Sequence, residues 1–285
     1  MDNKVNIPPV STKSGEPVGM EPIVGSSGTK KYIVVSLVAF TLLLAVVFIG
    51  YKLFFMSDKE SVDDRKADTA IQSAIDADDA VALSQFLKSG ADANLRLELA
   101  YRPVPVMYAV AQYKKKALAE LLKNGGDPNL RDEEGDTAVT LAVETYARDP
   151  EILAMVLEAG GDPNTRRSDD DPVIIRFVND ANLEGIRFMK GAGADIDVYT
   201  RTEDPLIVWA AGIEYWDVVW TLLDLGARYD TPGSRFTIAD FLNNPKVTPP
   251  DSPIYSYKVK VWNFLHDKGV ELPPLDGLEK KGEAL

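Results

Sequence analysis

The chain has 285 residues, of which 45% are hydrophobic, so it is long enough to form a sizeable core and carry further segments. Its net charge of −13 argues against a nucleic-acid partner, because the phosphates would be repelled. The chain contains no cysteine, which excludes disulfides and thiolate metal sites.

Residues 1–31 are polar and interrupted by prolines, which predicts a disordered N-terminal tail. They precede Tyr32–Tyr51, twenty residues without a charge, which as a helix would span about 30 Å, the thickness of a bilayer's hydrocarbon core. We therefore expect an uncleaved transmembrane signal-anchor helix over residues 32–55 and a charged linker over residues 56–66. Lys30 and Lys31 favour a cytoplasmic N-terminus, with the remaining chain in the periplasm if the source is a Gram-negative bacterium.

Glycine-led turns recur along the rest of the chain at near-constant spacing. Their first glycines lie 35, 35, 33 and 33 residues apart, at Gly90, Gly125, Gly160, Gly193 and Gly226. A period in this range is typical of stacked repeats, in which no unit buries its apolar face alone.

Within each period the pattern predicts a helix, a short turn, a second helix and a polar turn into the next unit. Leu118, Leu121 and Leu122 show the spacing of one buried helical face before the glycine that ends the helix. The start of the first helix is indicated by a candidate N-cap oxygen. These N-cap candidates are Thr69, Thr137, Asp171 and Asp204.

The stretch Asp132–Ala142, together with the later Gly160-Gly161-Asp162-Pro163-Asn164, resembles the ankyrin-repeat pattern. The resemblance covers residues 67–272. It implies an all-α fold, an ankyrin-like solenoid of about five to six helix-turn-helix repeats, here preceded by one transmembrane helix. The family's usual histidine is replaced by Gln72, Met107, Thr140, Ile174 and Ile207, so we expect neighbouring repeats to depend more on packing.

After residue 231 the repeat pattern loosens. Residues 236–242 and 257–266 predict a final helix pair, separated by a proline-rich insertion. A degenerate last unit is expected where an apolar outer face must become polar. Residues 273–285 are predicted to be a C-terminal tail.

Catalytic chemistry finds little support in this sequence. His266 is the one histidine, and there is no nucleophile elbow, phosphate loop or zinc-binding helix motif. The acidic run Asp169–Asp171 lacks the glycine and terminal glutamate of a calcium loop. We therefore expect no enzymatic activity, no cofactor and no metal.

A protein-binding surface is the remaining interpretation, because the resemblance implies recognition through the concave face formed by turn tips and first helices. Tyrosine, tryptophan and arginine are the side chains most often found as interface anchors. The candidate partner-binding residues are Tyr101, Arg102, Tyr108, Tyr113, Arg131, Glu134, Tyr146, Arg166, Asp169, Tyr199, Arg201, Tyr215 and Trp216.

The predicted function is a module tethered to the inner membrane through residues 32–55, with its protein-binding repeats in the periplasm. The first version is an immunity or inhibitor protein that neutralises a toxin, such as an enzyme delivered by type VI secretion. An acidic domain suits a basic effector, because opposite charge speeds association. Three alternatives stay open: a scaffold or chaperone for a periplasmic enzyme or envelope complex, an enzyme using a carboxylate pair, and a structural anchor acting through the spanning helix.

Overall fold

The structure is a computed structural model that describes residues 67–242 and 248–275. All described residues belong to one compact unit. The predicted tail, spanning segment and linker over residues 1–66 lie outside the described residues. So do residues 276–285 of the predicted C-terminal tail.

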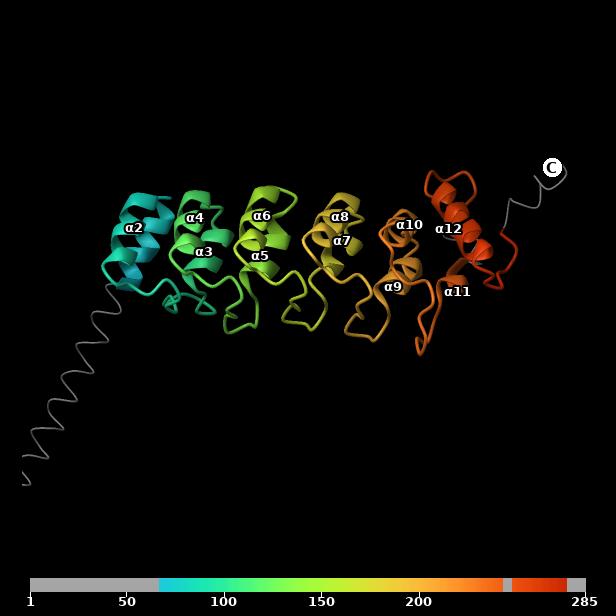
Figure 1. Cartoon of the computed structure of the whole chain (residues 1–285), viewed down its shortest axis with the longest axis horizontal. Coiled ribbons are helices and arrows are strands. Elements are labelled where there is room, and N and C mark those ends of the chain that lie inside the picture. Colours follow the sequence, from blue (N-terminus) through green and yellow to red (C-terminus); the bar gives the residue numbers. More distant parts are fainter. Residues whose placement is uncertain (1–66, 243–247, 276–285) are drawn as a thin grey trace, which may run out of the picture. The chain divides into compact units, whose positions relative to one another are not determined.

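The described residues form consecutive helix pairs joined by extended turns (Figure 1). The first helix of each pair is, in order, residues 67–76, α3 (Pro105–Ala111), α5 (Ala138–Thr145), α7 (Ile175–Asn179), α9 (Leu206–Gly212) and α11 (Ile238–Leu242). The second helices are α2 (Ala80–Lys88), α4 (Lys115–Lys123), α6 (Pro150–Glu158), α8 (Leu183–Gly191), α10 (Trp216–Asp224) and α12 (Tyr255–Asp267).

Like helices of neighbouring pairs pack on one another. Among first helices α3 contacts α5, and α9 contacts both α7 and α11. Among second helices α4 contacts α2 and α6, and α10 contacts α8 and α12. In these contacts the helices of one pair pack against the corresponding helices of the next pair.

The predicted fold class is corrected by the structure. In the ranges described, no helix combines the length and apolar character needed to cross a membrane. The longest helix wholly within those ranges, α12, has 13 residues, which span about 20 Å at the usual helical rise. The proposed spanning segment, residues 32–55, lies outside the described residues, so the transmembrane element is withdrawn from the fold class. What the structure supports is an all-helical fold of paired helices.

The five glycines that define the period lie after the second helices, as predicted. All have positive φ, between 88° and 101°, a region that side chains with a Cβ rarely adopt. The prediction of Thr137 as an N-cap is also confirmed. Its hydroxyl oxygen accepts from the Thr140 backbone N–H at 3.3 Å, while Thr140 Oγ1 accepts from the Thr137 N–H at 2.9 Å, completing a capping box.

The other predicted N-caps are wrong. Thr69 lies within the helical residues 67–76, and α7 and α9 are preceded by Ile174 and Pro205. Asp171 instead uses its carboxylate to tie two turns together, since Asp171 Oδ1 accepts from the Arg201 N–H at 2.8 Å. A carboxylate that can accept a hydrogen bond from a helix N-terminus can equally accept one from a neighbouring turn. At Asp171 the neighbouring turn supplies the donor.

Neighbouring turns are also joined by a repeated asparagine contact. The Asn129 side chain donates to the Gly160 carbonyl at 2.9 Å and accepts from the Asp162 N–H at 2.8 Å. Asn94 makes the same two bonds to Gly125 and Asp127, at 3.0 and 2.8 Å. The expectation that packing replaces hydrogen bonds between repeats is therefore incomplete, because these asparagine side chains form hydrogen bonds between neighbouring turns.

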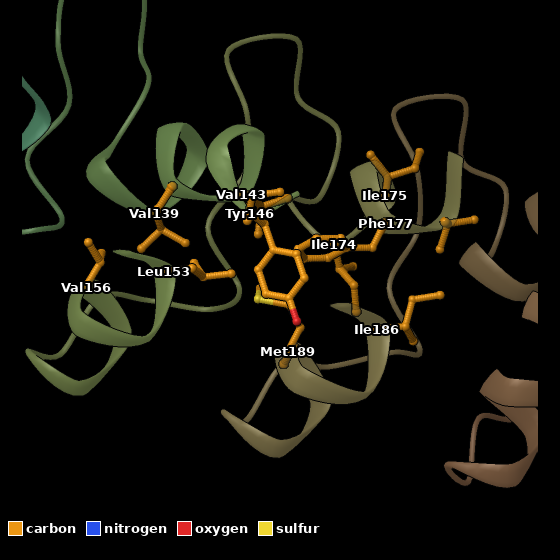
Figure 2. Close-up of a cluster of buried hydrophobic side chains, with 14 of the residues drawn as sticks. Val139, Val143, Tyr146, Leu153, Val156, Ile174, Ile175, Phe177, Ile186 and Met189 are labelled. Carbon is orange, nitrogen blue, oxygen red and sulfur yellow. The ribbon is translucent and has the colours of Figure 1, made fainter. Parts of the chain in front are cut away.

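Aromatic side chains fill the joint between the α5/α6 and α7/α8 pairs (Figure 2). The Tyr146 ring meets the Phe177 ring edge-on, with centroids 4.9 Å apart, and lies 5.7 Å from the Phe188 ring. Gly185 makes room for this packing, since a Cβ built on it would lie 2.3 Å from Phe177 Cδ1. The joint therefore needs a glycine on α8 opposite a large ring on α7.

The predicted final helix pair is present as α11 and α12, and a buried polar cluster attaches α12. Glu214 Oε2 accepts from Trp216 Nε1 at 2.8 Å and from Thr248 Oγ1 at 2.7 Å. Lys258 Nζ from α12 lies 3.6 Å from the same oxygen, and its side chain is only 2% exposed. A charge buried to this degree needs its partner, which makes the cluster a specific anchor for the last helix.

Candidate partner-binding surface

Two of the predicted anchors, Arg131 and Arg166, join successive turns. The Arg131 guanidinium donates to the Gly135 carbonyl of its own turn, and to the Arg166 carbonyl at 3.1 Å and Thr165 Oγ1 at 3.3 Å in the next turn. Arg166 donates to its own turn at Asp170 and to the Tyr199 carbonyl at 3.1 Å. Both guanidiniums are therefore occupied in holding the turns in register.

The most exposed aromatic side chains on these turns are Tyr101 and Tyr199. They are 56% and 42% exposed, although large rings are usually more buried. Tyr101 and Arg102 have positive φ values of 64° and 46°, and the Tyr101 carbonyl accepts from the Glu133 N–H of the next turn at 2.9 Å. The turn therefore holds the Tyr101 ring outward at a defined place.

First helices add two half-buried rings at matching positions. The Tyr108 hydroxyl on α3 donates to Asp76 Oδ1 at 2.6 Å, and Trp209 Nε1 on α9 donates to Asn179 Oδ1 at 2.9 Å. The hydrogen bond to the Asp76 carboxylate, with a smaller effect of burial, raises the pKa of Tyr108 above its ordinary value of 10.0. Both rings are thus oriented by a polar partner on the preceding pair.

A cluster of opposite charges lies between these aromatic positions. Glu144 pairs with Arg167 and with Arg176 Nη1, the latter at 3.3 Å. Arg201 lies 3.6 Å from both Asp169 and Asp171. Within the described ranges no group of three acidic or histidine side chains could hold a metal ion, and these carboxylates already face arginines.

Two predicted contact residues lie in the core. Trp216 is fully buried with its indole N–H bonded to Glu214, and Tyr146 is 8% exposed in the aromatic joint. Neither side chain offers surface to a partner. Tyr215 lies half-buried before α10, whereas Tyr113 is half-buried with Arg148 4.1 Å above its ring.

No protein-family model matches this chain, and no curated protein matches it. Its function is therefore inferred from the geometry of its own surface.

We call the exposed residues of four turns and of the adjoining first helices the turn surface. It consists of the turns at residues 95–104, 130–137, 165–174 and 198–205 with the exposed sides of α3, α5, α7 and α9. Figure 1 shows these turns projecting from the same side of the successive helix pairs. The charged and exposed members of the predicted set, which all lie on it, are Arg102, Arg131, Glu134, Asp169 and Arg201.

Sequence reasoning missed Glu144 and Arg176 as members of this surface. Arg176 stands on α7, at a position where the repeat pattern favours a small residue. That departure was the one available signal. Glu144 carried no signal of its own, because only the stacking of α5 beside α7 brings it to Arg176.

Proposed function

We propose that this chain is a protein-binding module whose partner contacts the turn surface. The observation that carries the proposal is the pair of exposed tyrosines, Tyr101 and Tyr199, on turns that arginine and backbone bonds hold in place. A rigid, amphipathic side chain contributes contact area while losing little conformational freedom on binding. The turn surface thus has the properties of a preorganised interface.

Within this class we propose an immunity or inhibitor protein that blocks a basic toxin, such as a secreted effector enzyme. The net charge of −13 supports this version, because opposite charge accelerates association and disfavours wrong partners. A scaffold or chaperone would use the same surface, and it is the alternative outcome of the experiment below. The periplasmic location depends on residues outside the described ranges and stays a prediction.

Site-specific photo-crosslinking in the producing cell tests the proposal. A benzophenone amino acid replaces Tyr101 or Tyr199 in the full chain, and the matched control carries it at Val81, which is 69% exposed on α2. We expect one crosslinked protein from positions 101 and 199 and none from position 81. Equal yields from all three positions would refute a binding site on the turn surface.

The crosslinked protein then separates the two versions. If the chain is an immunity protein, expression of that protein alone arrests growth, and co-expression of this chain restores it. A crosslinked partner that is harmless alone, and that loses solubility or assembly when this chain is deleted, would favour the scaffold or chaperone. If neither growth arrest nor a loss of solubility or assembly is seen, both the immunity version and the scaffold version are overturned.

A further inference from the structure

One position recurs in every turn between helix pairs, two residues after the asparagine or aspartate that closes the glycine-led motif. It is occupied by Arg96, Arg131 and Arg166 in the first three turns, by Tyr199 in the fourth and by Pro232 in the fifth. Arg131 and Arg166 use it to donate hydrogen bonds into the next turn. The fourth turn keeps the same backbone pattern but has no guanidinium there.

The acceptors that a guanidinium would use are still present in the following turn. Arg131 Nη2 donates to Thr165 Oγ1 at 3.3 Å, and Arg131 Nη1 donates to the Arg166 carbonyl at 3.1 Å. Two repeats later, the positions of Thr165 and Arg166 are taken by Thr231 and Pro232. Thr231 Oγ1 is buried and has no hydrogen-bond partner, which is costly for a hydroxyl.

A cavity of about 80 Å³ lies at this place. Tyr199, Thr231 and Pro232 line it, together with an apolar floor that includes Leu206 and Ile207. The volume exceeds the roughly 30 Å³ that one water molecule occupies in the liquid. The cavity therefore has room for a planar group of several atoms, and Thr231 is one of the residues that line it.

The charges of the lining favour a cation. Asp197, Asp230 and Arg228 line the cavity, one positive charge against two negative, which gives a net charge of −1. The side chain of Arg228 is 57% exposed, and its Nε lies 3.4 Å from Asp230 Oδ1, so it lies at the rim. Its backbone N–H binds Asp197 Oδ1 at 2.8 Å, as the Asp195 N–H binds Asn164 Oδ1 one turn earlier.

We propose that this cavity binds the guanidinium group of an arginine supplied by the protein partner. The proposal rests on the proposed function, because the arginine comes from the protein that contacts the turn surface. The guanidinium donates to Thr231 Oγ1 and the Pro232 carbonyl, lies against the Tyr199 ring, and faces Asp197 and Asp230. Arginine suits the site better than lysine, because its planar fork reaches two acceptors at once and stacks on aromatic rings.

Ethylguanidinium chloride is the probe, measured on the full chain by saturation-transfer NMR, with n-butylammonium chloride and n-butyramide as matched comparisons. We expect ethylguanidinium to bind several-fold more tightly than either comparison. Thr231→Val should weaken that binding about tenfold, since a hydrogen bond to a charged group is lost. Equal binding of ethylguanidinium and n-butylammonium would overturn the proposal.

Two variants test the repeat argument itself. Tyr199→Arg restores the missing guanidinium, so probe binding should be lost and the thermal midpoint should rise. Arg131→Ala opens the equivalent place beside Thr165, so the midpoint should fall and ethylguanidinium, not n-butylammonium, should partly restore it. The cavity is not a guanidinium site if ethylguanidinium still binds to Tyr199→Arg. The same conclusion follows if neither cation restores the thermal midpoint of Arg131→Ala.

The probe does not depend on the partner, so the two proposals fail separately. If ethylguanidinium binds but crosslinking at Tyr101 and Tyr199 captures no protein, the guanidinium site stands and the proposed function falls. If a partner is captured at Tyr199 but ethylguanidinium shows no preference over n-butylammonium, the function stands and the guanidinium site falls.

Discussion

The two hydrogen bonds that Asn129 makes to the next turn allow the effect of a substitution on stability to be predicted. Asn129 both donates to the Gly160 carbonyl and accepts from the Asp162 N–H. Each such bond contributes about 0.5–1.5 kcal/mol net, and the lower half of that range applies where water competes, as it does here. Asn129→Ala should therefore lower the free energy of unfolding by about 1–2 kcal/mol.

Aspartate at the same position separates the two bonds. Asn129→Asp keeps the acceptor for the Asp162 N–H but loses the donor to Gly160, so about half of the alanine effect is expected. The chain already contains this acceptor-only case, because Asp197 at the equivalent place accepts from the Arg228 N–H at 2.8 Å. If the turns are equivalent, Asp197→Asn gives the Gly226 carbonyl a donor and should raise the unfolding free energy by up to about 1 kcal/mol.

Urea unfolding of the full chain, followed by far-ultraviolet circular dichroism, measures these differences. The dependence of the unfolding free energy on urea should stay constant across the series, so that midpoint shifts report stability alone. Equal losses in Asn129→Ala and Asn129→Asp would refute the role of the donor. A destabilised Asp197→Asn would refute the equivalence of the turns.

Three further outcomes follow from the core and from the first helices. Gly185→Ala should lower the free energy of unfolding by about 1–3 kcal/mol, because the new Cβ collides with Phe177. Adding Phe177→Leu should restore part of this loss, as measured by urea unfolding. If the second substitution restores nothing, the collision is not the cause. Removing one partner of the buried pair, by Glu214→Gln or Lys258→Met, should cost about 3–5 kcal/mol, and the double variant should cost less than the sum of the two. Additive losses would instead show that the pair is not coupled. The raised pKa of Tyr108 means that the folded state holds its proton more tightly than the unfolded state, whose value is near 10.0. This stabilisation is complete below pH 10 and is lost as the pH rises through the folded-state pKa, so Tyr108→Phe should flatten the alkaline decline in thermal midpoint; an unchanged decline would contradict it.

Local signals in the sequence predicted the helix pairs well. Each period-defining glycine ends a helix with positive φ, because that conformation is a property of the residue and its immediate neighbours. The Thr137 cap was predictable for the same reason, since its partner Thr140 lies three residues away. Asp171 failed as a cap because its acceptor role depends on Arg201, which only the next turn supplies.

Which side chains the candidate surface exposes could be predicted only in part. Residue type correctly pointed to exposed rings at Tyr101 and Tyr199, but it could not separate them from Tyr146 and Trp216. Those two rings are buried because the neighbouring pairs close over them. Burial of an aromatic side chain depends on what packs above it, and the sequence of its own helix does not contain that information.

By itself the sequence determined the period, the pairing of helices and the chain's acidic character, because these depend on residue type and short spacing. Only the tertiary structure decided what the repeated side chains do across turns. It shows that Arg131 and Arg166 donate hydrogen bonds to neighbouring turns, and that Thr231 Oγ1 is buried without a hydrogen-bond partner. The reason is distance along the chain: these contacts join residues more than thirty positions apart, so they exist only once the helix pairs have stacked.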